Sequence, residues 1–338
     1  MKSFNKPIKL LVAGAALVTI GLCVLAGVRA AGTTASVQTE SGTVNTPASS
    51  IADSSASAGQ AVKFGSAVTG GARTCPAYPL FPDSTCTGVP AGTSLTTING
   101  NYTTTSNGQH IDGKLIQGDL IVNNDNVVVT NTRIVGLITN NSSGLSLTDS
   151  DVGLNSCLAT AYENGNYSNL AGSNYTLTRT HIHNAGADLI GIGGTGTILI
   201  QDSILDQACY YAGDHLDAAQ FYAPGAVGHV TFEHSVLNGD PVNSSVHGNS
   251  AIFWADTPGN GSTLEVNHSS LAGGGYTVAL YDAVVGSHIV LTVENSTFVA
   301  GSWQYYYCAS SNSVQYNGQE GVRFLNNVSS TGAALSGC

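Results

Sequence analysis

The sequence contains few charged residues, since Asp, Glu, Lys and Arg together make up 9% of its 338 residues. Its 10 basic residues are outnumbered by 21 acidic ones, which leaves a formal net charge of -11. A chain with so few basic side chains offers little to phosphate groups, so nucleic acid is not expected as a partner. The shortage of Glu, Lys and Arg also disfavours helices, whereas 41 glycines suit strands that are joined by tight turns.

The first 30 residues have the pattern of an export signal. Three lysines precede an apolar run over residues 10–28, and Val28 and Ala30 are small residues at positions −3 and −1 of a cleavage site. The run is long for a signal peptide, so an uncleaved membrane anchor is the alternative. We expect a secreted or cell-surface protein that contacts a membrane only through residues 10–28, if at all.

Two further regions follow the export signal. Residues 31–73 are rich in Ser, Thr, Ala and Gly and show no apolar periodicity, which predicts a disordered linker. Prolines and aromatic residues appear together from Thr74 onward, so residues 74–338 are expected to form the folded domain.

Six cysteines lie beyond the export signal, and none shows the C-x-x-C or Cys/His spacing of a zinc site. An even number of cysteines in an exported chain is typical of structural disulfides, although many pairings are possible. Proximity in the sequence favours the pairs Cys75–Cys86, Cys308–Cys338 and Cys157–Cys209.

A strand-and-turn pattern recurs from residue 127 onward, as in LSLTDSDVGL, YTLTRTHIHN and VTFEHSVLNG. Apolar residues alternate with polar ones before a short polar turn, and this period of two predicts half-buried strands. The central turn residues recur at steps of 18 to 34 residues, which is typical of a solenoid: Asn131, Asp149, Arg179, Asp202, His234, His268, Asn295 and Asn326.

An all-β fold, a single-stranded right-handed parallel β-helix (solenoid) of about 8–10 rungs, explains this repeat best. The apolar pairs, such as Leu145 and Leu147, would stack on those of the next rung along the axis. A β-propeller needs more regular blades, and the antiparallel strands of a β-sandwich would not need the same turn chemistry to recur.

A second strand is expected upstream of each turn motif. The candidates are DLIGI, DAAQFY, SAIFWAD and YTVALYD, which begin at Asp188, Asp217, Ser250 and Tyr276. Side by side, these strands would form one face that carries acids, aromatic residues and Gln220. We expect an extended ligand to bind on this face.

The region from about Thr87 to Gly301 resembles the parallel β-helix proteins of the pectin-lyase-like superfamily, and more narrowly a largely uncharacterised secreted bacterial group. The matching stretches are TGVPAGTSLT, IDGKLIQGDLIV, the His-x-Asp-x-x-Gln of HLDAAQ, SAIFWAD and LAGGGYTV. The group usually has Gly where this chain has Ala218. Lyases, hydrolases, epimerases, phage tailspikes and adhesins share this fold, so the resemblance implies the fold more specifically than the function.

His215, Asp217 and Gln220 are the first candidates for chemistry, and the resembling group carries the same motif. His215 would act as an acid or base, Asp217 would orient it or bind a cation, and Gln220 would contact sugar hydroxyls. On an ideal strand Asp217 and Gln220 face opposite sides. The alternative is a turn capped by Asp217, with Gln220 buried and hydrogen-bonded.

Carboxylates form a second set of candidates, namely Asp188, Asp217, Asp256 and Asp282. A glycosidase needs two carboxyl groups about 5–10 Å apart, and adjacent rungs would supply that separation. The same oxygens would suit Ca²⁺, the one cofactor that the sequence makes possible. The alternative is that these aspartates only end strands.

His181 and His183 form a His-x-His pair, a spacing that can bind metal. Because no third ligand is evident in the sequence, we assign no metal site. His183 precedes Asp188 and matches a histidine of the resembling group, so we assign it to the catalytic group instead.

We therefore expect a monomeric, exported protein that binds and cleaves an extracellular polysaccharide as a hydrolase or a lyase. A non-catalytic cell-surface adhesin or glycan-binding protein is the alternative. The scarcity of Lys and Arg in the repeats counts against a lyase that acts on polyuronates. The expected catalytic residues are His215, Asp217, Asp188 and His183, and the expected substrate contacts are Gln220, Trp254, Tyr281 and Asp256.

Overall fold

The computed structural model describes residues 49–52, 60–63, 73–158, 168–221, 228–254, 263–280, 290–301, 303–308 and 321–335. The chain divides into two compact units, Met1–Ala72 and Arg73–Cys338. In the first unit, β1 (Ser49–Ala52) pairs antiparallel with β2 (Gln60–Lys63), within the segment where the sequence predicted a disordered linker. The export signal lies outside the described residues. Where the structure describes the chain, no helix has the length and apolar character to cross a membrane.

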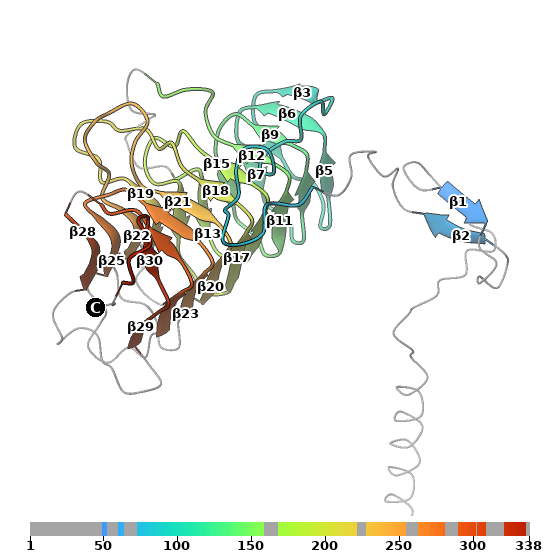
Figure 1. Cartoon of the computed structure of the whole chain (residues 1–338). Coiled ribbons are helices and arrows are strands. Elements are labelled where there is room, and N and C mark those ends of the chain that lie inside the picture. The colour runs from blue at the N-terminus through green and yellow to red at the C-terminus, as the bar shows by residue number, and fades with distance from the viewer. Residues whose placement is uncertain are drawn as a thin grey trace, which may run out of the picture. The chain divides into compact units, whose positions relative to one another are not determined.

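The second unit is a right-handed parallel β-helix, in which each coil adds one strand to each of three parallel sheets (Figure 1). We name these sheets I, II and III, in the order in which a coil visits them. Sheet I contains β4 (Tyr102–Thr103), β7 (Leu120–Val122), β10 (Ile138–Asn140), β13 (Leu170–Gly172), β16 (Ile190–Ile192), β19 (Asp217–Phe221), β22 (Ser250–Trp254), β25 (Tyr276–Leu280) and β28 (Gln304–Cys308).

Sheets II and III complete each coil. Sheet II contains β5 (His110–Asp112), β8 (Val128–Thr130), β11 (Leu145–Thr148), β14 (Tyr175–Thr178), β17 (Thr197–Gln201), β20 (His229–Glu233), β23 (Thr263–Asn267), β26 (Val290–Glu294) and β29 (Gly321–Leu325). Sheet III contains β3 (Thr96–Asn99), β6 (Lys114–Gln117), β9 (Arg133–Ile134), β12 (Asp151–Val152), β15 (His181–Ile182), β18 (Ile204–Leu205), β21 (Val236–Asn238), β24 (Ser270–Ala272), β27 (Thr297–Phe298) and β30 (Val328–Ser329). The predicted solenoid of about 8–10 rungs is therefore confirmed.

Apolar side chains fill the interior in columns that run along the axis. In sheet II, Leu145 is in register with Tyr175, and Leu147 is in register with Leu177. These two columns continue through β17, β20, β23 and β26, with every member at most 2% exposed: Ile198, Val230, Leu264 and Leu291, and Ile200, Phe232, Val266 and Val293. Each such side chain stabilises the fold by roughly 1.5–3 kcal/mol relative to an exposed one.

The turn between sheets II and III has the same backbone conformation in successive coils. Its central residue has a φ between 47 and 55° at all eight predicted turn positions, from Asn131 to Asn326. This left-handed conformation costs a residue other than Gly on the order of 1 kcal/mol or more, so something must favour it at every coil.

A ladder of buried polar side chains follows directly after these turns. In Ser235, for example, Oγ donates to the Glu233 carbonyl at 3.1 Å and accepts from the Ser203 N–H at 3.2 Å. Ser235 therefore satisfies one backbone group of its own coil and one of the preceding coil. The members of the ladder are all at most 1% exposed: Thr132, Ser150, Thr180, Ser203, Ser235, Ser269, Ser296 and Asn327.

Residues 73–88, which we call the N-terminal strap, cover the row of turn residues. The Gly88 N–H donates to the Arg179 carbonyl at 2.9 Å, and His234 Nε2 donates to the Leu80 carbonyl at 2.9 Å. The Tyr78 ring lies 4.9 Å from the His268 ring. The strap thus contacts several coils that come much later in the sequence.

Two of the three predicted disulfides are present. Cys75–Cys86 closes the strap, and Cys157–Cys209 joins the loops that follow β12 and β18. The predicted pair Cys308–Cys338 lies outside the described residues, because neither the side chain of Cys308 nor residue 338 is described.

The ladder predicts a large stability loss for Ser235→Ala. This change leaves the Ser203 N–H buried without its acceptor, which should lower the free energy of unfolding by about 1–3 kcal/mol. Denaturant unfolding measures the difference. Ser270→Ala is the control, since Ser270 is a half-buried residue of β24 in sheet III. Equal stability of the two variants would show that the ladder does not stabilise the fold.

Candidate functional site

An open cavity of about 590 Å³ lies over the outer face of sheet I. The strands predicted to form a ligand-binding face, β16, β19, β22 and β25, are adjacent in this sheet, as expected. The cavity lies at one side of them and extends over β10 and β13. Its lining combines small, amide, hydroxyl and carboxyl side chains: residues 137–141, Ser168, Ala171, Gly172, Ala187, Asp188 and Gln220.

Strand alternation explains why Gln220 reaches this cavity. In β19, Asp217, Ala219 and Phe221 are buried toward the interior, whereas Gln220 is half-buried on the outer face. Its neighbours in register are Gly191 and, one strand further, Ala171. Since these two residues have little or no side chain, the sheet beside Gln220 remains open.

Asp188 and Asp217 form a pair that connects the cavity to the protein interior. Asp188 lines the cavity and is 7% exposed, whereas Asp217 is 0% exposed. The backbone N–H of Asp217 donates to Asp188 Oδ1 at 3.0 Å, and Asn249 Nδ2 donates to Asp217 Oδ2 at 3.5 Å. The second oxygen of Asp217 has no hydrogen-bond partner among the described residues.

Burial changes the protonation of both carboxyls. Burial, assisted by the charge of Asp214, raises the pKa of Asp188 to about 7. Burial and the charge of Asp188 raise the pKa of Asp217 well above its ordinary range. Of the two, only Asp188 reaches the cavity wall, where it can exchange a proton with a bound ligand.

The structure does not assemble His215, Asp217 and Gln220 into one site. His215 is exposed, Asp217 lies in the interior, and only Gln220 lines the cavity. The predicted opposite orientation of Asp217 and Gln220 is confirmed. The residue that sequence reasoning missed is Asp214, which precedes His215 and acts electrostatically on Asp188.

The predicted substrate contacts have different outcomes. Trp254 is 2% exposed and stacks on Phe221 in the core, with 4.7 Å between ring centroids, so it is not available to a substrate. The β-strand alternation that exposes Phe253 turns Trp254 inward. Asp256 and Tyr281 lie outside the described residues.

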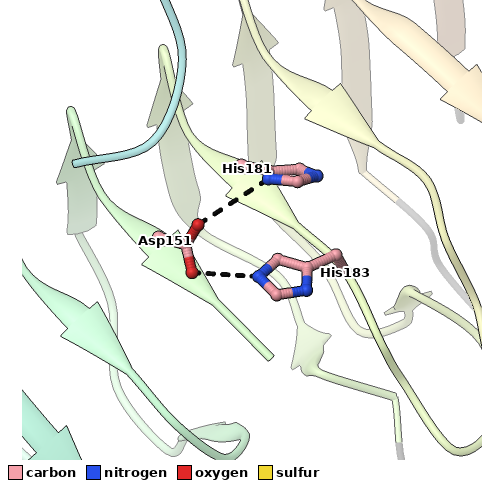
Figure 2. A group of neighbouring side chains, drawn as sticks. All are labelled: Asp151, His181 and His183. Carbon is pink, nitrogen blue, oxygen red and sulfur yellow. Dashed lines mark hydrogen bonds and ion pairs between the residues drawn. The ribbon is translucent and has the colours of Figure 1, made fainter. Parts of the chain in front are cut away.

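A second cluster lies on the outer face of sheet III, where Asp151, His181 and His183 meet (Figure 2). His183 Nε2 lies 3.0 Å from Asp151 Oδ1, and His181 Nδ1 lies 3.7 Å from Asp151 Oδ2. His181 Nε2 lies 2.7 Å from Asp206 Oδ1, and Arg133 forms an ion pair with Asp151. His183, which the sequence placed in the catalytic group, therefore contacts Asp151 on sheet III, away from the described lining of the cavity on sheet I.

The β-helix register brings these side chains together. Asp151 of β12 is the direct neighbour of His181 in β15, and buried Ile182 turns the two histidines outward. A Cβ at Gly153 would clash with the His183 carbonyl, so glycine allows this close approach. Asp151 follows the turn residue Asp149 by two positions, just as His181 follows Arg179. Aligning the repeats by their turns would therefore have identified the third ligand that seemed absent from the sequence.

The positive and negative side chains of this cluster balance one another in charge. Burial opposes charge on His181, but its hydrogen bonds with Asp151 and Asp206 outweigh that effect and raise its pKa to about 9. Burial likewise favours neutral Asp151, yet hydrogen bonds from His181 and His183 hold its pKa well below the usual range. Arg133 and His181 thus carry positive charges that match Asp151 and Asp206.

No protein-family model, curated protein or solved structure matches this chain. The parallel β-helix is shown by the three sheets and their register.

The buried carboxyl of Asp217 predicts a pH-dependent stability. Because folding raises its pKa, the folded protein binds more protons than the unfolded chain above the usual carboxyl range. The stability that this group gives to the folded protein is then highest at acidic pH, and it falls as the pH rises through the pKa of Asp217 in the folded state. Asp217→Asn cannot ionise, so its melting temperature should exceed that of the wild type at mildly alkaline pH.

Thermal melts across the pH range test this expectation. Glu265→Gln serves as the control, since Glu265 is an exposed residue of sheet II. If the wild type and Asp217→Asn lose stability in parallel as the pH rises, Asp217 does not carry the raised pKa.

Proposed function

We propose that the chain is a secreted or surface-attached, monomeric β-helix protein of the pectin-lyase-like type that binds and cleaves a neutral extracellular polysaccharide. The observation that carries this proposal is Asp188, a carboxyl with a raised pKa on the wall of an open cavity that is lined by both apolar and polar groups. The two disulfides agree with an oxidising, extracellular location.

Asp188 is suited to act as the general acid. Glycosidic bond cleavage requires a proton on the leaving oxygen, and a carboxyl with a pKa near the working pH supplies it effectively. Asp217 positions this group, since its N–H binds Asp188 Oδ1 from inside the coil. Gln220 would hydrogen-bond a sugar hydroxyl in the same cavity.

Asp214 is the best candidate for the second carboxylate that a glycosidase needs. Its charge raises the pKa of Asp188, so the two groups lie near each other. Burial raises the pKa of Asp214 as well, but the Tyr211 N–H and the charge of His215 oppose this. Asp214 would activate the attacking water or attack the sugar itself, and His215 would help to keep it ionised.

The charge of the chain favours hydrolysis of a neutral glycan. Its formal net charge of -11 opposes the binding of a polyuronate, which is itself negatively charged. Elimination also needs a base beside the uronate carboxylate, whereas the raised pKa of Asp188 makes it a proton donor.

Binding without cleavage is the second candidate. The observation that favours it is that Asp188 is the one carboxyl in the described lining of the cavity itself. A cell-surface adhesin or glycan-binding protein would need the polar lining but no second acid.

A panel of neutral and acidic polysaccharides, assayed for new reducing ends and for unsaturated sugars, tests the proposed hydrolase. We expect new reducing ends from a neutral member, and a loss of about 10²–10⁴-fold in turnover for Asp188→Asn. The activity should fall as the pH rises above about 7, because Asp188 must be protonated. Glu265→Gln should keep the wild-type rate.

Binding measurements on the same panel separate the two candidates. Glycan binding that depends on Gln220, as shown by Gln220→Ala, with no new reducing ends on any member, would establish a binding protein and reject the hydrolase. An unsaturated product from an acidic member would instead reject the proposed neutral substrate and hydrolytic reaction.

A further inference from the structure

We propose that Asp151, His181 and His183 form a binding site for a divalent transition metal ion of the Zn²⁺ class. The site lies on the outer face of sheet III and uses no residue of the cavity on sheet I, so it is independent of the proposed polysaccharide site. Its donors are one carboxylate oxygen and two imidazole nitrogens, a set that such ions prefer.

The distances between the donor atoms fit one small ion. All three lie within 4.8 Å of one another; His183 Nε2 is 3.0 Å from Asp151 Oδ1, and His181 Nδ1 is 3.7 Å from Asp151 Oδ2. Ligands about 2.0–2.1 Å from a tetrahedral ion are separated by about 3.3 Å. Side-chain adjustments of up to about 1–1.5 Å would therefore bring the donors to coordinating positions.

A second carboxylate orients one of the ligands. Asp206 holds Nε2 of His181 at 2.7 Å, which directs Nδ1 of the same ring toward Asp151. Metal-binding histidines typically have such a partner on the nitrogen that does not bind the metal. A structural ion pair between His181 and Asp151 alone would not require Asp206.

The backbone around the ligands is also fixed before any ion binds. The N–H groups of Asp151, His181 and His183 all donate to carbonyls of the preceding coil. Asn169 Nδ2 donates to the His183 carbonyl at 2.6 Å. Binding therefore costs little ordering of the chain, which favours affinity.

The cluster is partly open to solvent. The side chains of Asp151 and His181 are 19% and 20% exposed, so water can reach them. Gly88 of the strap packs alongside, and a Cβ at this position would be in van der Waals contact with Asp151 Oδ2 at 3.4 Å. Three protein ligands with an accessible fourth position are typical of zinc sites that bind water.

The ion must compete with the Arg133 guanidinium. Arg133 forms an ion pair with Asp151, so binding draws this carboxylate away from it. This competition predicts opposite effects for two substitutions. His183→Gln removes a ligand and should weaken binding, whereas Arg133→Gln removes a competing cation and should tighten it.

The test uses the tag-free full chain, stripped with a chelator and titrated with Zn²⁺ alone. We expect one equivalent of zinc, measured by elemental analysis after gel filtration, and a rise in melting temperature on binding. Titration with Co²⁺ should give visible absorption bands of a nitrogen- and oxygen-ligated ion. His183→Gln should lose at least about tenfold in affinity, Asp206→Asn about 10–100-fold, and Arg133→Gln should gain affinity.

His247→Gln is the matched control, because His247 also pairs with an aspartate, Asp240, but lies on the surface outside the cluster. It should bind zinc as the wild type does. Less than one equivalent in the wild type, or equal binding by the wild type and His183→Gln, would overturn the proposal and leave a metal-free charge network. Melts of the stripped variants confirm that each is folded, and the wild-type stoichiometry decides even if one is not.

Discussion

The hydrogen bond from the N–H of one coil to the buried hydroxyl of the next is the interaction on which this fold depends. It recurs after most of the left-handed turns, for example from Ser203 to Ser235 and from Ser235 to Ser269. Because both partners are buried, a coil that departs from this geometry leaves polar groups unsatisfied. The corner between sheets II and III is therefore held constant, and variation in length falls in the loops from sheet III to sheet I and from sheet I to sheet II. The loops from sheet III to sheet I supply both Asp188 and Asp214.

The fold was predictable from the sequence because the repeat has the same physical basis in every coil. Alternating residues such as Leu145 and Leu147 identify the inward columns, and polar residues able to adopt positive φ identify the turns. The site was less predictable, since its residues belong to loops without periodicity. His215 and Asp217 are two positions apart, yet one is exposed and the other is buried. Neighbours in space such as Asp151 and His183 are 32 positions apart.

The two candidate sites use the same architecture in different ways. On sheet I, Gly191 and Ala171 open a space that a ligand can fill, and burial together with the charge of Asp214 raises the pKa of Asp188 beside it. On sheet III, register alone places an acid of one coil beside a histidine of the next. A solenoid therefore brings functional groups together by aligning single residues from successive coils. It needs no motif that is contiguous in sequence.

The N-terminal strap has a consequence for the order in which the protein forms. Its partners include Arg179, His234 and His268, which belong to coils far along the chain. Because a chain is synthesised from its N-terminus, the strap exists before the surface that will receive it. Its docking must wait until the coil of His268 has stacked, so a segment that is made early reaches its final position late. It then joins coils that have already stacked on one another.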